Sequence, residues 1–330
     1  MNVRPVFIGG CSRSGTTLLA AMLGSSPDIV TVPEAEFKWD ALKDGSVFDG
    51  QVRLGRLLDF LAADPKFAYW DVALPRLVSG ERDEQVPFAA VLSHLAASHA
   101  HAAGKPEATM WVDHTPGNIR YVSTLAEMFP AGRFVHIVRD GRGVASSVIP
   151  LDFGPNTVAE AADYWSSQVS MGLAATAHVG DERAATVRFE DLVQRPRAIL
   201  TALCDHLGVA FDDGMLHRRD YRVQSYTADQ HELVARPPDP LRSTAWRTAL
   251  TPRDVEIFEA RTGELLRYLG YVNDYGITAR DLDKREHLTS ASRSLARRLV
   301  TDRVRRYLRR RRPIRSAPSA ATGVKSRATT

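Results

Sequence analysis

The residues of this sequence best suited to binding a phosphate group form the stretch GGCSRSGTTLL at positions 9–19. The stretch follows an apolar run and opens a helical pattern, and in that setting glycines let successive backbone N–H groups converge on an anion. The spacing from Gly10 to Gly15 is that of a Walker A loop, but Thr16 stands where that loop has lysine. The stretch therefore predicts a phosphate-binding loop, with a turn that binds no ligand as the alternative.

Side chains within the loop compensate for the missing lysine. Arg13 supplies a positive charge, and hydroxyl donors are supplied by Ser14, Thr16 and Thr17. A Walker lysine neutralises β- and γ-phosphates, and the hydroxyl that follows it holds magnesium. A ligand without a γ-phosphate needs neither, so we expect the loop to bind such a ligand.

A second candidate for anion binding is Arg139, which follows the apolar run Arg133–Val138. Open parallel sheets bind ligands at the carboxyl ends of their strands, and a planar guanidinium can donate two parallel hydrogen bonds to a phosphate. Ser147 lies about two helical turns further on and adds a hydroxyl. Two alternatives remain: Asp140 can hold magnesium at the end of a Walker B strand, or Arg139 can simply pair with Asp140 or with a helix end.

Two carboxylates, Glu34 and Glu36, follow the apolar run Ile29–Val32. If that run is a strand of the same sheet, both carboxylates can point to the edge at which the phosphate loop lies. Either can then act as a general base. A surface carboxylate without a chemical role is the alternative for each.

The elements that must position these residues alternate between strand-like and helical patterns. Short apolar runs predict five strands, at Pro5–Gly9, Ile29–Val32, Thr109–Val112, Arg133–Val138 and Ala185–Arg188. Helical periodicity is found at Thr16–Leu23, Leu54–Ala63, Pro87–Ala103, Ile119–Met128, Gly141–Val148, Val158–His178 and Arg197–Leu207. The alternation predicts an α/β fold with a parallel sheet flanked by helices. A long loop or flap is expected at 218–250, and a helix from the N-cap Thr251 to Leu269.

The loop Arg13–Thr17 resembles the 5′-phosphosulfate loop of sulfotransferases that use 3′-phosphoadenosine 5′-phosphosulfate (PAPS), especially the branch with the tyrosylprotein sulfotransferases. Arg139 with Ser147 resembles the 3′-phosphate site of that family. The segment Arg188–Leu192 resembles a Tyr-Glu-Asp-Leu segment whose aromatic ring lies near the nucleotide, with Phe189 in place of the tyrosine. These three segments are therefore expected to bind the nucleotide.

The resemblance spans roughly residues 3–276 and implies a P-loop NTPase-like fold with three catalytic side chains, those of Glu34, His114 and Arg13. It places Glu34 on the catalytic glutamate of the family and Glu36 where the tyrosylprotein enzymes have arginine, so Glu34 is the preferred base. His114 falls where the family has the lysine of a Lys-x-Pro segment. As imidazolium His114 can donate to the leaving oxygen, and as neutral imidazole it can only hydrogen-bond weakly or act as a base. A structural histidine is the alternative.

The Arg-Lys-Gly cofactor motif of the cytosolic small-molecule sulfotransferases is missing, and its place can be taken beside Trp246 by Arg242, Thr244 or Arg247. The resemblance implies sulfuryl transfer from PAPS to an acceptor hydroxyl, without a metal. Carbohydrate, glycolipid, small natural product and tyrosyl acceptors all remain open. Two other classes also stay open: a P-loop kinase that needs Mg·ATP, and an adaptor that binds nucleotide without transferring a group.

Charge is distributed unevenly along the 330 residues. Residues 284–330 contain 15 Lys and Arg against two acids, whereas the first 283 residues carry 28 basic and 37 acidic groups. This balance disfavours a nucleic-acid role for the main domain. We therefore expect a sulfotransferase domain at 1–276 and, at 277–330, an Arg-rich amphipathic helix followed by a disordered end.

The Arg-rich stretch 289–312 is expected to meet an anionic membrane surface or an acidic partner, or to be a solvated helix. The sequence has no run of 18 apolar residues, and its two cysteines, Cys11 and Cys204, are too few for a disulfide framework. These features favour a cytoplasmic protein, peripheral at the inner membrane face if the basic stretch binds lipid. The excess of Arg over Lys, 37 against 6, indicates a GC-rich bacterial genome.

Overall fold

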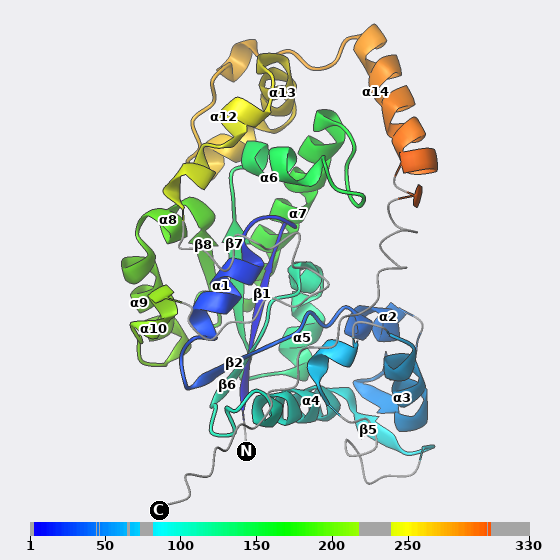
Figure 1. Cartoon of the computed structure of the whole chain (residues 1–330), viewed down its shortest axis with the longest axis vertical. Coiled ribbons are helices and arrows are strands. Elements are labelled where there is room, and N and C mark those ends of the chain that lie inside the picture. Colours follow the sequence, from blue (N-terminus) through cyan, green and yellow to red (C-terminus); the bar gives the residue numbers. More distant parts are fainter. Residues whose placement is uncertain are drawn as a thin grey trace, which may run out of the picture.

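Five parallel strands form the central sheet of the protein, in the order β2-β6-β1-β7-β8 (Figure 1). The computed structural model describes residues 3–43, 45, 47–64, 67–72, 82–217, 239–301 and 303–304. The strands are β1 (Arg4–Gly10), β2 (Ile29–Val32), β6 (Met110–Asp113), β7 (Arg133–Val138) and β8 (Ala184–Arg188). The five predicted strands are therefore confirmed, with ends that shift by at most one residue, and neighbouring strands pair in parallel.

Helices cover both faces of this sheet, which explains why the strands are apolar at nearly every position. Successive side chains of a strand point to opposite faces. Accordingly, Val6 and Ile8 of β1 lie in one core and Phe7 lies in another. The first core is closed by α1 (Thr16–Leu23), α9 (Pro196–Leu207) and α10 (Gly214–His217). The second is closed by α4 (Phe88–Ala102), α5 (Val122–Met128) and α7 (Val158–Val179).

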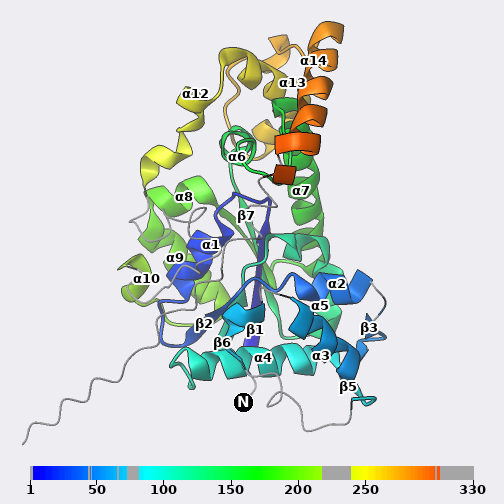
Figure 2. The same cartoon turned by 45° about the vertical axis from the view of Figure 1, so that its right-hand side comes forward.

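A small antiparallel sheet that the sequence patterns did not predict lies near the amino edge of the main sheet, at the bottom of Figures 1 and 2. Its strands are β3 (Val47–Phe48), β4 (Gln51–Arg53) and β5 (Gln85–Pro87). Strands of two or three residues are too short to show a period-two pattern. Beside them lie α2 (Phe37–Lys43), the predicted helix α3 (Leu54–Ala63) and the turn η1 (Phe67–Trp70).

A group of helices stands beyond the carboxyl edge of the main sheet, at the top of Figures 1 and 2. It comprises α6 (Gly141–Val148), η5 (Pro240–Ser243), α12 (Trp246–Ala249), α13 (Pro252–Tyr268) and α14 (Lys284–Ala296). Shorter elements complete the described chain: η3 (Pro116–Arg120), α8 (Phe189–Gln194), η6 (Gly276–Thr278) and η7 (Arg297–Thr301).

The carboxyl-terminal helices follow the sequence patterns in part. The N-cap at Thr251 is confirmed, because its hydroxyl accepts from the backbone N–H of Asp254 in a capping box. Residues 218–238 of the predicted loop lie outside the described residues, whereas 240–249 form η5 and α12 instead of loop. The helix α14 contacts α13 through the 2.7 Å ion pair between Glu286 and Arg253.

The apolar stripe predicted on the basic helix is exposed where the structure describes it, at Leu295, Leu299, Val300 and Val304. Tyr307, Leu308 and the rest of the tail lie outside the described residues. Within the described part of the chain, no helix combines the length and the apolar character needed to cross a membrane.

Buried neutral histidines make the fold sensitive to acid. His136, in the middle of β7, is 1% exposed, and neither ring nitrogen has a hydrogen-bond partner among the described residues. Burial lowers the pKa of His136 to about 4, against 6.5 for an exposed histidine. Between pH 6.5 and 4 the unfolded chain therefore takes up a proton that the native protein does not, and native stability falls as the pH falls.

We expect His136→Leu to reduce this dependence, because the leucine has no proton to bind. The free energy of unfolding, measured with denaturant at pH 7 and pH 4.5, should fall less on acidification in His136→Leu than in the wild type, by up to about 3 kcal/mol. His94→Leu is the matched control at an exposed site on α4 and should leave the difference unchanged. Equal acid sensitivity of wild type and His136→Leu would refute the assignment.

Candidate active site

Each strand of the main sheet delivers one candidate residue to the same edge. Parallel strands have their carboxyl ends on one side, and that side is where open α/β sheets bind ligands. The residues that follow β2, β6, β1, β7 and β8 are Glu34, His114, Arg13, Arg139 and Phe189. Candidates separated by up to 176 positions in the chain are therefore gathered at one edge by the topology alone.

The loop between β1 and α1 has the curled backbone expected of an anion cradle. Arg13 has φ 73° and Gly15 has φ 102°, both in the left-handed region. For a residue with a Cβ such as Arg13 this conformation is strained, and strain of this kind gathers at binding sites. The hydroxyl of Ser14 is buried without a hydrogen-bond partner among the described residues. The loop therefore presents an unsatisfied donor beside the first turn of α1, whose N–H groups have no partner within the helix.

The side chains of Arg13 and Arg139 belong to one cluster. Arg139 donates through its guanidinium to the carbonyl oxygen of Arg13 at 2.9 Å and to that of Arg242 at 3.1 Å. Arg13 Nε donates to the hydroxyl of Ser147 at 3.1 Å. Gly143, one turn before Ser147 on α6, leaves room for the guanidinium, since a Cβ there would lie 3.1 Å from Arg139 Nε. Two motifs about 125 positions apart thus meet directly.

Phe189 connects the two halves of this cluster. Its ring lies under the guanidinium of Arg139, 4.4 Å from Cζ to the ring centroid. The same ring touches the phosphate loop, because a Cβ on Gly15 would approach Phe189 Cδ2 to 2.7 Å. A phenylalanine here keeps the cation–π contact and provides an apolar surface beside the loop.

The electrostatics of the cluster favour an anion. Burial, the largest cause, and the neighbouring charges of Arg13 and Arg242 lower the pKa of Arg139 to about 10, although the carboxylates of Glu190 and Asp140 act in the opposite direction. Burial likewise lowers the pKa of Arg13, with Arg242 adding to the effect. The charge of Arg242 thus acts on both other arginines, and Arg139 Nε has no hydrogen-bond partner among the described residues. An anion with several oxygen atoms, such as a phosphate, fits this donor set.

Glu34 and His114 form a second pair at the same edge. The distance from His114 Nδ1 to Glu34 Oε1 is 3.9 Å, which is too long for a hydrogen bond. Burial lowers the pKa of His114 to about 4, so the ring is neutral at neutral pH. This favours a neutral imidazole over the imidazolium as the form present before a ligand binds. The side chain of Glu34 is 15% exposed and favours the charged form of Arg13, whereas Glu36 is exposed at the start of α2.

Asp140 does not have a free carboxylate for magnesium. It caps α6 by accepting from the N–H of Arg142, and it also accepts from the Arg142 guanidinium at 2.8 and 3.0 Å. Arg142 is held in turn by Glu259 at 2.7 Å and lies over the ring of Trp246. The Walker B alternative for this segment is therefore disfavoured.

Sequence patterns did not identify the groups that hold Arg139 and Phe189 in place. The carboxylate of Glu190 accepts from the backbone N–H of Asp140 at 3.0 Å and from the hydroxyl of Tyr271 at 2.9 Å. Arg242 is the one of the three candidates near Trp246 whose charge acts on Arg139, whereas Arg247 forms an ion pair with Asp274 at 2.9 Å. No local motif distinguishes Arg242 from Arg247, so spatial proximity alone decides between them.

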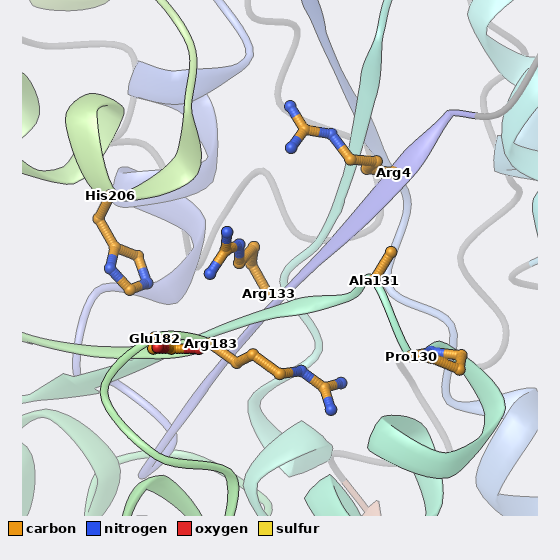
Figure 3. A pocket seen from close by; sticks show the side chains of 7 residues that line it. All are labelled: Arg4, Pro130, Ala131, Arg133, Glu182, Arg183 and His206. Carbon is orange, nitrogen blue, oxygen red and sulfur yellow. The ribbon is translucent and has the colours of Figure 1, made fainter.

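A basic cavity of about 490 Å³ lies at the opposite, amino edge of the sheet (Figure 3). Arg4 and Arg133, the first residues of β1 and β7, line it together with Arg183 and His206. Arg183 is engaged with backbone carbonyls, including that of Phe129 at 3.0 Å. This cavity is separate from the candidate active site, and Arg133 therefore offers a control position for experiments on the arginine cluster.

We expect Gly15→Ala to weaken binding of 3′-phosphoadenosine 5′-phosphate (PAP) by about 5- to 150-fold. The substitution places a Cβ in a left-handed backbone conformation, at φ 102°, and against the ring of Phe189. We expect the resulting strain, about 1–3 kcal/mol, to displace the loop from its binding conformation. Gly104→Ala is the matched control, with φ 75° and nothing within 4 Å of its Cβ. Calorimetric titration should show the loss for Gly15→Ala only; equal PAP affinity in both variants would contradict this placement of the loop.

The fold and the site define an α/β protein that gathers a glycine-rich loop, an arginine cluster, a carboxylate and a histidine at the carboxyl edge of its parallel sheet. A family model described as the sulfotransferase family matches residues 5–213, which is more than half of the chain. The protein belongs to the sulfotransferase family. Residues beyond 213, with Arg242 among them, lie outside that match.

Individual relatives agree with this family. The chain is 23% identical over 277 residues to protein-tyrosine sulfotransferase A of Caenorhabditis elegans, covering 81% of this chain and 67% of that protein. It is 24% identical over 220 residues to protein-tyrosine sulfotransferase 2 of Gallus gallus, covering 65% of this chain and 54% of the chicken protein. Among solved structures, the sulfotransferase domain of the Synechococcus PCC 7002 olefin synthase matches with a TM-score of 0.61 and 25% identity, over 82% of this chain and 96% of that domain.

Proposed function

We propose that this sulfotransferase uses PAPS as its donor and transfers the sulfuryl group to an acceptor hydroxyl with Glu34 as the general base. The observation that carries the proposal is the meeting of three guanidinium groups, from Arg13, Arg139 and Arg242, at the edge that also bears Glu34 and His114. A nucleotide with phosphates at both its 3′ and 5′ positions needs such a concentration of donors. Deprotonation of the acceptor hydroxyl needs a carboxylate beside the bound nucleotide.

In the proposed transfer the acceptor oxygen bonds to sulfur while the bond from sulfur to the bridging phosphate oxygen breaks. The electron pair of that bond stays on the phosphate, where Arg13 and the first turn of α1 stabilise the developing negative charge. The hydroxyl proton passes to Glu34. His114, neutral before the ligand binds, is suited to orient the acceptor or to donate a hydrogen bond to the departing oxygen. None of these roles requires a metal ion.

The acceptor remains one of four classes: carbohydrate, glycolipid, small natural product or tyrosyl group. Relatives named as tyrosine sulfotransferases favour the tyrosyl class, whereas the likeness to a sulfotransferase domain of an olefin synthase favours a small natural product. Radiolabelled sulfate transfer from PAPS should therefore be measured against a panel with one member of each class. We expect transfer to at least one of them.

Nucleotide binding separates the proposed enzyme from the kinase and adaptor alternatives. We expect PAP to raise the melting temperature in the absence of magnesium and Mg·ATP to raise it much less. A larger shift with Mg·ATP would support a kinase instead. Binding of PAP with no transfer to any member of the panel or to a fractionated lysate would support an adaptor.

The basic carboxyl-terminal helix is proposed to contact an anionic membrane surface, with the enzyme on the cytoplasmic face. Its exposed apolar side chains and its excess of arginine support this. Sedimentation with vesicles containing phosphatidylserine should decrease when Leu299 and Val300 are replaced by Ser. Equal binding by that variant and the wild type would count against membrane contact.

A further inference from the structure

A buried ion pair lies close to the pair formed by Glu34 and His114, since the charges of both its members act on His114. Lys38 of α2 donates to the carboxylate of Asp113, the last residue of β6, and both side chains are 1% exposed. Lys38 also lies over the ring of Trp39, 4.5 Å from its centroid. Neither residue stood out from the sequence, because one lies in a short helix and the other precedes His114 without a recognised motif.

Hydrogen bonds connect this ion pair to both catalytic segments. The second carboxylate oxygen of Asp113 accepts from the hydroxyl of Thr115 at 2.5 Å and from its backbone N–H at 2.9 Å. The Thr115 hydroxyl in turn accepts from the backbone N–H of Ala35 at 2.9 Å. Ala35 is the neighbour of Glu34, and both Asp113 and Thr115 are neighbours of His114. The end of β2 is thereby joined to the end of β6 through one hydroxyl.

A further contact fixes Asp113 relative to the phosphate loop. The side-chain amide of Asn118 donates to the carbonyl oxygens of Ile8 at 3.0 Å and Asp113 at 3.1 Å, and it approaches the Asp113 carboxylate at 3.3 Å. Ile8 belongs to β1, which leads into the loop with Arg13. The network therefore holds Glu34 and His114 in a fixed position relative to the strand that leads into the phosphate loop.

We propose that Asp113, held by Lys38, is a positioning residue that sets the separation between Glu34 and His114 through the hydroxyl of Thr115. A buried ion pair contributes little to stability compared with apolar side chains of the same volume. The pair instead fixes the relative position of Lys38 and Asp113, because neither charge can be left buried without its partner. Geometry matters here because a misplacement of 1 Å between reacting groups can reduce turnover by about 100-fold.

The charged groups around His114 come from three segments of the chain, and the pKa of His114 reports on their balance. Glu34 follows β2, Asp113 ends β6, and Lys38 lies on α2. Asp113 raises the pKa of His114 and Lys38 lowers it, while burial has the largest effect. We therefore expect Lys38→Met to raise the pKa of His114 and Asp113→Asn to lower it. A purely structural pair whose loss loosens the site would move the pKa in the same direction in both variants, toward 6.5.

This inference rests on the proposed function, and its main test compares Thr115→Val with Thr115→Ser. Valine keeps the shape and removes the bridge to Ala35, whereas serine keeps the bridge. With the best acceptor of the panel, we expect Thr115→Val to lower kcat by about 10- to 100-fold with the PAP dissociation constant within twofold, and Thr115→Ser to stay within threefold of wild type. Thr262→Val removes another buried hydroxyl, on α13, and should leave kcat unchanged. A wild-type kcat in Thr115→Val, or equal losses in both Thr115 variants, would overturn the proposal.

A double variant separates the effect of the ion pair on kcat from its effect on folding. Lys38→Met/Asp113→Leu replaces the pair by apolar side chains; we expect a melting temperature close to wild type and a reduced kcat. Wild-type kcat in that variant would overturn the proposal.

A spectroscopic test does not depend on activity. Glu34→Gln should change the ¹⁵N chemical shift of His114 Nδ1 when Thr115 is present, and much less in the Thr115→Val background. An equal change in both backgrounds would overturn the positioning role even if no acceptor is found, whereas absence of sulfuryl transfer alone would count against the proposed function.

Discussion

Arg139→Ala should weaken PAP binding by about 100-fold. The guanidinium is partly buried, donates to the carbonyl oxygens of Arg13 and Arg242, and retains a buried donor at Nε for a ligand. Hydrogen bonds to charged groups contribute about 1.5–3 kcal/mol each, and the loss of one strong contact with a phosphate corresponds to roughly two orders of magnitude in affinity. Isothermal titration with PAP measures the effect directly.

Controls for this prediction separate charge from geometry. Arg139→Lys keeps one positive charge but loses the fork that bonds two oxygens at once, so its affinity should remain well below wild type. Arg133→Ala removes the same side chain at the opposite edge of the sheet and should leave the affinity unchanged. Wild-type affinity in Arg139→Ala with an unchanged melting temperature would remove Arg139 from the nucleotide site.

Glu34→Gln should lower kcat by about 100- to 10,000-fold while PAP affinity changes little. Proton transfer by a positioned carboxylate contributes a factor of this size, and an amide keeps the shape of Glu34 but cannot accept the proton. The single-turnover rate of sulfate transfer, measured at saturating PAPS, reports the chemical step without product release. The PAP dissociation constant of the same variant shows whether the loss is confined to that step.

Glu36→Gln is the matched control for the base. Glu36 lies two positions away and is also a carboxylate, but it is exposed at the start of α2, whereas Glu34 lies 3.9 Å from His114. Its replacement should leave kcat within about threefold of wild type. A large loss of kcat in Glu36→Gln together with a small loss in Glu34→Gln would show that Glu36, and not Glu34, is the base.

The strands, the phosphate loop and the family could be predicted from the sequence because each depends on local patterns. Five apolar runs, a glycine-rich turn before a helix and an arginine after a strand are visible in short windows of sequence. The parallel sheet confirms the five strands, and the match to the sulfotransferase family confirms the family, whereas phosphate binding by the loop and by Arg139 stays a prediction. The small antiparallel sheet and α2 were not predicted, since their elements are too short for a periodic signal.

The sequence by itself determined which groups reach the carboxyl edge, because chain direction and strand ends are local properties. Only the tertiary structure decided how they combine there. The order β2-β6-β1-β7-β8 brings Arg13 to Ser147 and Glu34 to His114, and the helices above the sheet bring Arg242 rather than Arg247 to Arg139. Such pairs join residues far apart in sequence, and the energy of a buried contact depends on the separation and burial of the two groups in space, which no local pattern encodes.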